Sequence, residues 1–223
     1  MKLVWSPDTA TKAYIDTIKS CELFQHSSVA ELISAMAAGW NVKLIVETWS
    51  QGGVTTTSIG LDIASRHTCG RHVCIVPDEE SKLEYIEAME KAGMSPEVKV
   101  GEPEEVVGGL IGIDFLVVDC RHSDYARILR VAKLGHRGAV LVCKNASSRS
   151  GSDFGWPSVI DGGSRLMRSV FLPVGKGLDI AHVATGGGSS GSGEGQGRWI
   201  KHIDQQSGEE YVIRRTFHTA SAN

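Results

Sequence analysis

The feature that most constrains this chain is an alternation of short apolar runs with segments whose apolar residues keep helical spacing. The apolar runs lie at Val42–Glu47, His72–Val76, Glu97–Val100, Phe115–Val118 and Ala139–Cys143. Strands separated by amphipathic helices are typical of right-handed βαβ units, which build a parallel sheet with helices on both faces. The sequence therefore predicts an α/β fold with a doubly wound, mostly parallel sheet.

Two helices are predicted before the first apolar run. The first covers about Thr9 to Ser20. The second begins at Ser28, where the serine and Glu31 form a capping box in which each side chain satisfies a free backbone amide of the other's residue. Gly39 is a natural end for this second helix.

The pattern changes after Cys143. Ser169–Pro173 and Leu178–Val183 predict a hairpin, and a second hairpin is predicted from Arg198–Asp204 and Glu210–Arg215. Between the hairpins, Gly186–Gly197 is almost entirely Gly and Ser, which cannot bury apolar surface. We therefore expect a main domain at 1–184, a flexible tether at 185–197 and a C-terminal hairpin with its tail at 198–223.

The composition of the chain limits the classes of partner that the protein can bind. Its 223 residues carry a formal net charge of -3, which provides no general attraction to nucleic acid or to an anionic membrane. No apolar run approaches the roughly 20 residues that a membrane-spanning helix requires. The five cysteines form no CxxC pair, which argues against a disulfide framework or a zinc site. We expect a cytoplasmic or nuclear protein whose partner is a small-molecule ligand.

Polar residues close several of the predicted strands or follow them directly. They are Glu47, Asp78, Glu102, Asp119 and Lys144. In an open parallel sheet, ligands bind beyond the carboxyl ends of the strands. Asp78, which precedes two glutamates, fits a helix cap. For Glu47 and Asp119, a ligand site and a purely structural role both remain open.

Residues 28–183 resemble the S-adenosylmethionine-dependent O-methyltransferases of the catechol and caffeoyl-CoA type. The resemblance is carried by Glu31–Gly39, Val42–Thr57, Asp114–Tyr125, Gly138–Asn145 and Leu172–Val183. More closely, the chain resembles a plant family of unknown function with that fold. The resemblance implies a methyltransferase-like, Rossmann-like sheet of seven strands with an antiparallel last strand.

The resemblance also implies a cofactor site for S-adenosylmethionine after the first strand. Glu47 matches the acid that opens the family's turn, and the glycines Gly52 and Gly53 stand in its later part. Trp49 occupies the position of the first family glycine, and we expect its indole to crowd the pocket.

Two further cofactor contacts are implied on the neighbouring strands. The family places an acid for the ribose hydroxyls at the position of Val76, and Asp78 follows two residues later as a possible substitute. Glu102 resembles the acid that meets the adenine amino group. These residues complete the expected cofactor-binding set together with Asp119.

The resemblance is weakest at the metal site of the catechol-type enzymes. Asp119 and Asn145 match two metal ligands, but Lys144 stands where the family has another aspartate. An ammonium group repels Mg²⁺ and Ca²⁺, so we expect no metal and instead an ion pair between Lys144 and Asp119 within about 4 Å. His122 stands at the position of the family's general base, and His122 and Asp119 are the catalytic candidates.

Two functions remain open at this stage. One is a metal-independent methyltransferase with an unknown methyl acceptor. The other is a non-enzymatic binding or regulatory module in which the methyltransferase site has degenerated, as the replacements at Trp49, Val76 and Lys144 would suggest. A fold alone does not assign an activity.

Overall fold

The computed structural model describes residues 3–21, 28–122, 124–148, 154–160 and 163–185, together with the backbone of 198–203 and 210–215. The chain divides into two units, Met1–Gly187 and Gly188–Asn223. No helix within these described ranges is long and apolar enough to cross a membrane.

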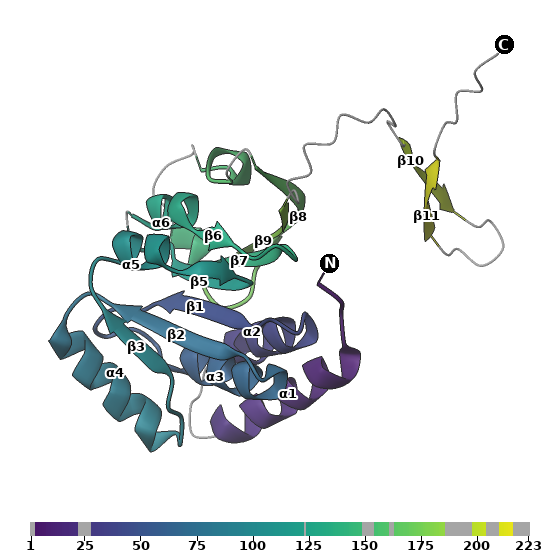
Figure 1. Cartoon of the computed structure of the whole chain (residues 1–223). Helices are drawn as coiled ribbons and strands as arrows, with labels where there is room; N and C mark the ends of the chain where they lie inside the picture. Colours follow the sequence, from purple (N-terminus) through teal and green to yellow (C-terminus); the bar gives the residue numbers. More distant parts are fainter. Residues whose placement is uncertain are drawn as a thin grey trace, which may run out of the picture. The chain divides into compact units, whose positions relative to one another are not determined.

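The first unit is built on a seven-stranded sheet with the order β3-β2-β1-β5-β7-β9-β8 (Figure 1). Its strands are β1 (Leu44–Thr48), β2 (Arg71–Val76), β3 (Glu97–Val100), β5 (Phe115–Asp119), β7 (Ala139–Lys144), β8 (Ser164–Leu172) and β9 (Leu178–Thr185). The five neighbouring strands β3, β2, β1, β5 and β7 pair in parallel. Strand β9 is antiparallel to both of its neighbours, β7 and β8. This arrangement confirms the predicted doubly wound sheet with an antiparallel last strand.

Helices cover both faces of the sheet (Figure 1). They are α1 (Pro7–Cys21), α2 (Ser28–Gly39), α3 (Thr56–Thr68), α4 (Glu79–Lys91), α5 (Pro103–Gly109) and α6 (Tyr125–Val131). Helices α1 to α4 contribute side chains to one apolar core, while α5 and α6 contribute to a second core on the opposite face. Helix α2 begins at Ser28, the residue at which a helix was expected to begin.

Several short elements were not predicted from the sequence. They are α5, a separate two-stranded pair formed by β4 (Ile111–Ile113) and β6 (Lys133–Leu134), and the 3₁₀ turns Ala146–Ser148 and Trp156–Ser158. Each is too short to show a hydrophobic period.

The second unit contains an antiparallel hairpin. Its strands are β10 (Arg198–Ile203) and β11 (Glu210–Arg215), in register from Arg198 opposite Arg215 to Ile203 opposite Glu210. These are the two strands expected from the sequence. The predicted tether at Gly186–Gly197 lies outside the described residues.

The parallel strands bring their carboxyl ends to one edge of the sheet. Asp119 at the end of β5 is in register with Lys144 at the end of β7, and Glu47 of the neighbouring β1 is in register with Val117. Side chains alternate along a strand, so Glu47, Asp119 and Lys144 all project to the face covered by α1 to α4. Glu47 and Asp119 therefore lie at the same edge of the sheet, on neighbouring strands.

Candidate functional site

A small cavity of about 200 Å³ lies at the carboxyl ends of β1, β2, β3 and β5. Three residues that the sequence singled out, Glu102, Asp119 and His122, meet there. The full lining is Thr48, Trp49, Ser50, Pro77, Glu102, Pro103, Asp119, His122, Asp124 and Ile128. The Ser50 hydroxyl lies 3.0 Å from His122 Nε2, so a hydrogen bond joins the loop after β1 to the loop after β5.

A larger cavity of about 670 Å³ adjoins the ends of β5 and β7. Its walls come from the starts of α2 and α3, from the loops after β5 and β7, and from the turn between β8 and β9. The lining residues are Ser28, Val29, Val54, Thr56, Thr57, Asp119, Arg121, Lys144, Asn145, Val174, Gly175, Lys176, Gly177 and Leu178. Asp119 lines both cavities. Small-molecule sites commonly enclose roughly 300–1,000 Å³, and the larger of these two cavities falls in that range.

Asp119 is held by a cluster of donors. The Arg121 guanidinium approaches it with Nη2 2.7 Å from Oδ2 and with Nε 3.1 Å from both carboxylate oxygens. The Arg121 backbone amide donates to Oδ1 at 3.0 Å, and the Asn145 side-chain amide donates to Oδ2 at 2.9 Å. Burial raises the pKa of Asp119, but these hydrogen bonds outweigh burial and hold the pKa below its usual value. Asp119 is therefore a fixed anion.

The expected ion pair between Lys144 and Asp119 is wrong. Arg121 takes the place of the lysine, because it follows Asp119 by two residues and its planar guanidinium contacts both carboxylate oxygens at once. Lys144 does not point into solvent either, since only 8% of the residue is exposed and it lines the larger cavity. The lysine is thus a buried cation beside the cavity.

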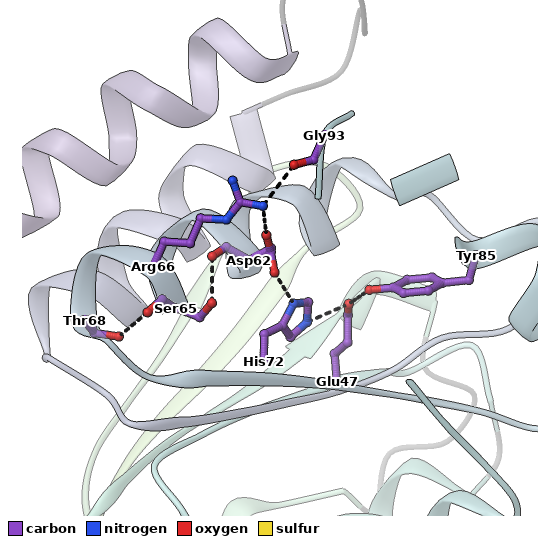
Figure 2. A network of polar contacts seen from close by, with 8 residues as sticks. All are labelled: Glu47, Asp62, Ser65, Arg66, Thr68, His72, Tyr85 and Gly93. Carbon is purple, nitrogen blue, oxygen red and sulfur yellow. Dashed lines mark hydrogen bonds and ion pairs between the residues drawn. The ribbon is translucent and has the colours of Figure 1, made fainter. Parts of the chain in front are cut away.

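Glu47 belongs to a buried polar network beneath the edge of the sheet (Figure 2). Its Oε1 accepts a hydrogen bond from the Tyr85 hydroxyl at 2.9 Å and lies 3.0 Å from His72 Nε2. Burial raises the pKa of Glu47, but the hydrogen bond and charge of His72 outweigh burial and hold the pKa below its usual value. Glu47 is not among the residues that line the two cavities.

The network continues through His72 to α3 (Figure 2). His72 Nδ1 lies 3.8 Å from Asp62 Oδ1, and Asp62 Oδ2 lies 2.8 Å from Arg66 Nη2. Burial lowers the pKa of His72, but its interactions with the carboxylates of Asp62 and Glu47 outweigh burial and raise it to about 9. Because its imidazole is charged at neutral pH, His72 ties β2 to both β1 and α3.

Trp49 lies in the turn after β1 and lines the small cavity. The Trp49 indole packs edge-on against Tyr85, with ring centroids 5.3 Å apart, and only 4% of Trp49 is exposed. A Cβ on Gly53 would lie 2.7 Å from Trp49 Nε1, so glycine at 53 lets the indole lie beneath the turn. Neither Gly52 nor Gly53 lines the two cavities.

Asp78 is the N-cap of α4. Its carboxylate accepts a hydrogen bond from the Ser81 backbone amide at 2.7 Å, and this bond lowers the pKa of Asp78. The side chain of Val76 is fully buried, whereas Pro77 lines the small cavity. Of Val76, Pro77 and Asp78 at the end of β2, only Pro77 lines the small cavity.

The side chains around the two cavities determine which metal or cofactor the site can bind. Among the described residues, no group of three or more His, Cys, Asp or Glu side chains is arranged to hold a metal ion. Glu102 at the small cavity is exposed and can accept hydrogen bonds from an adenine amino group. The residues present thus partly fit S-adenosylmethionine, with the ribose acid lacking.

Sequence reasoning missed several lining residues, including Ser50, Thr56, Thr57 and Lys176. They lie in loops and first helical turns, and their residue types carry no chemical motif. The sequence did contain one indication that Arg121 belongs to the site. Arg121 lies two residues after an aspartate that ends a buried strand.

Several solved structures with a similar fold are described as methyltransferases. A methyltransferase from Geobacter sulfurreducens is 21% identical to this chain, with a TM-score of 0.55 over 81% of this chain and 92% of that chain. The SAH-bound Podospora anserina methyltransferase PaMTH1 is 14% identical, with a TM-score of 0.55 over 81% and 89%. The O-methyltransferase TomG from Streptomyces achromogenes, in complex with SAM, is 18% identical, with a TM-score of 0.50 over 78% and 90%.

These likenesses confirm the methyltransferase-like, Rossmann-like fold. No curated protein matches the chain. A family model described as protein of unknown function DUF1442 matches residues 1–215. With that match spanning nearly the whole sequence, the chain belongs to the DUF1442 family.

Proposed function

We propose that this protein is an S-adenosylmethionine-dependent methyltransferase that works without a metal. The observation that carries the proposal is the meeting of Glu102, Asp119 and His122 around one cavity at the carboxyl edge of the sheet. In a doubly wound sheet this edge, beside the strand where the order reverses, is where ligands bind.

The residues of the small cavity have separable roles in this proposal. Glu102 would accept a hydrogen bond from the adenine amino group, and Asp119 would present a fixed negative charge to the middle of the cofactor. S-adenosylmethionine, when bound, supplies a methyl group on a sulfonium centre. The loop after β1, including Ser50, would shield the cofactor from water.

His122 would serve as the general base for an acceptor hydroxyl. Its Nε2 atom lies at the wall of the small cavity, and its present partner is the Ser50 hydroxyl at 3.0 Å. Breaking that single exposed hydrogen bond would free the imidazole for the acceptor proton. The Asp119 carboxylate is saturated by Arg121 and Asn145 and is therefore unsuited to the same task.

The absence of a metal requirement rests on Lys144. In the resembling catechol-type enzymes an acid at this position helps to hold the cation, and an ammonium there repels one. The role of the metal in orienting the acceptor would fall to side chains of the larger cavity.

Calorimetric titration with S-adenosylhomocysteine tests the cofactor part of the proposal. Binding should occur without added metal. Glu102→Gln removes the carboxylate and should weaken binding, since a hydrogen bond to a charged group is worth about 1.5–3 kcal/mol. Glu105→Gln, an exposed change on the neighbouring α5, is the matched control and should leave the affinity unchanged.

If no binding is measured with the wild-type protein, the methyltransferase proposal fails. The chain would then be the non-enzymatic module that the replacements in the cofactor turn suggest. If binding is normal but Glu102→Gln has no effect, adenine does not meet Glu102.

A further inference from the structure

Lys144 is a mostly buried cation that forms no direct ion pair with a described residue. It is 8% exposed and lines the larger cavity, yet the structure gives its ammonium group no ion pair and no hydrogen bond within the described part of the chain. Its charge acts on the carboxylates of Asp119 and Glu47 and helps to lower the pKa of each, but neither carboxylate forms a hydrogen bond with the ammonium group. The ammonium is therefore available to a ligand in the cavity.

The rest of the cavity adds positive charge. Arg121 and Lys176 line the same volume, and Asp119 is the one carboxylate among its lining residues. That carboxylate is already bound by Arg121 and Asn145. With Arg121 paired to Asp119, Lys144 and Lys176 remain as two further cations at the cavity, which therefore favours a ligand that carries negative charge.

The start of α3 strengthens this preference. Thr56 and Thr57, in the first turn of this 13-residue helix, line the cavity, and the N-cap residue Thr55 forms no side-chain cap. The first backbone amides of a helix lack partners within the helix, and the helix dipole places partial positive charge there. Both features favour an anion at this end of the cavity.

Part of the cavity wall is apolar. Val29, Val54, Val174 and Leu178 contribute to its lining. Gly175 has a φ of +59°, and a Cβ there would lie 2.7 Å from a Val29 methyl group. The turn between β8 and β9 thus closes tightly against the start of α2, which gives the cavity a dry side.

We propose that the larger cavity binds an organic anion, with its carboxylate or phosphate oxygens on Lys144 and its apolar body against the valine wall. The role of this anion as the methyl acceptor rests on the proposed function. Lys144 and Lys176 lie on β7 and on the β8–β9 turn, on the far side of β5 from the β1, β2 and β3 ends that build the small cavity. The anion site is therefore separate from the adenosine end of the cofactor site.

Calorimetric titration at constant ionic strength tests the proposal with benzoate, phenyl phosphate and benzamide. Benzamide has the shape of benzoate without the charge. We expect either anion to bind at least about tenfold more tightly than benzamide, as expected for loss of a charge-assisted hydrogen bond. Comparing benzoate with phenyl phosphate shows which anionic group the cavity prefers.

Substitution of single lysines tests where in the protein the anion binds. Lys144→Met should weaken the preferred anion about tenfold to hundredfold while leaving benzamide unchanged. Lys91→Met is the matched control, because Lys91 is an exposed lysine of α4 paired with Glu87, and it should have no effect. The comparison of benzoate with benzamide on the wild-type protein holds even if Lys144→Met fails to fold.

Three results would overturn the proposal. They are equal binding of benzoate and benzamide, unchanged anion binding in folded Lys144→Met, and complete loss of benzoate binding in saturating S-adenosylhomocysteine. The last result would assign the anion site to the carboxylate of the cofactor. If the anion binds through Lys144 while S-adenosylhomocysteine does not bind at all, the proposed function fails and the anion site stands.

Discussion

The Nε2 atom of His72 lies 3.0 Å from the Oε1 atom of Glu47, and both side chains are fully shielded from solvent (Figure 2). These residues lie on the neighbouring strands β1 and β2, and Tyr85 of α4 donates to the same carboxylate oxygen. The pair therefore joins two strands and a helix directly beneath the edge where ligands are expected.

Removing the Glu47 carboxylate should strongly destabilise the fold. Glu47→Gln leaves a charged, buried His72 with less compensation, and breaking a buried ion pair costs about 3–5 kcal/mol. Urea unfolding followed by far-ultraviolet circular dichroism measures the loss. The exposed change Glu87→Gln, which breaks a surface pair with Lys91, is the control and should barely move the midpoint. Equal effects of both changes would contradict a special role for the buried pair.

The same pair predicts how stability depends on pH. The pKa of His72 is raised from 6.5 to about 9 in the folded protein. Its stabilisation is therefore fully present below pH 6.5 and is lost as the pH rises through about 9. The free energy of unfolding, measured in urea across this window, should fall steadily.

The variant His72→Gln separates this effect from other groups. Burial raises the pKa of the Cys21 thiol to about 11 and raises the pKa of Cys74, so these thiols also reduce stability, but only from about pH 9 upward. His72→Gln should flatten the curve between pH 6.5 and 9 and leave the thiol contribution above it. An unchanged slope in that window would place the titration elsewhere.

Metal dependence should appear only after two substitutions. Lys144→Asp alone should gain little metal-dependent stability, because Arg121 and Asn145 already bind the Asp119 carboxylate. Lys144→Asp combined with Arg121→Gln should expose two carboxylates beside Asn145 and bind Mg²⁺ or Ca²⁺. At metal concentrations 100 times the dissociation constant, the gain would be about 2.7 kcal/mol.

Thermal unfolding with and without each metal measures that gain. The single variant Arg121→Gln serves as the control, since it retains the Lys144 ammonium. Stabilisation of the wild-type protein at low metal concentration would contradict the assignment of Lys144 as the feature that excludes the metal.

Cofactor affinity should rise when an acid is restored at the end of β2. Pro77 lines the small cavity there, so Pro77→Glu places a carboxylate where the ribose hydroxyls are expected. One added charge-assisted hydrogen bond should tighten binding of S-adenosylhomocysteine about tenfold to hundredfold. Pro77→Gln, tested by the same calorimetric titration, should give a smaller gain. Equal affinities for the two variants and the wild type would place the ribose elsewhere.

The sequence predicted the large elements because their apolar residues repeat over many positions. The strand centred on Ile45 and the helix that begins at Ser28 are examples. It did not predict α5 at Pro103–Gly109, whose seven residues include two glutamates and two glycines. A pairing as short as Lys133–Leu134 leaves no periodic signal.

The sequence located the edge of the site but not the direction of each side chain. That Glu47 and Asp119 reach one edge follows from parallel strands of known order. That Glu47 turns to His72 depends on the register of β1 against β2, which no local pattern reveals. The choice of Arg121 over Lys144 as the partner of Asp119 depends on loop geometry and on the planar guanidinium.

Asp119 forms part of the wall of both cavities, and Arg121, its ion-pair partner, lines the larger one. A ligand anion that draws the guanidinium toward itself weakens its hold on the carboxylate that the other ligand meets. Two ligands bound on either side of this carboxylate would therefore alter each other's dissociation constants by the same factor. Through that one side chain, the affinity of each site comes to depend on whether the other site is filled.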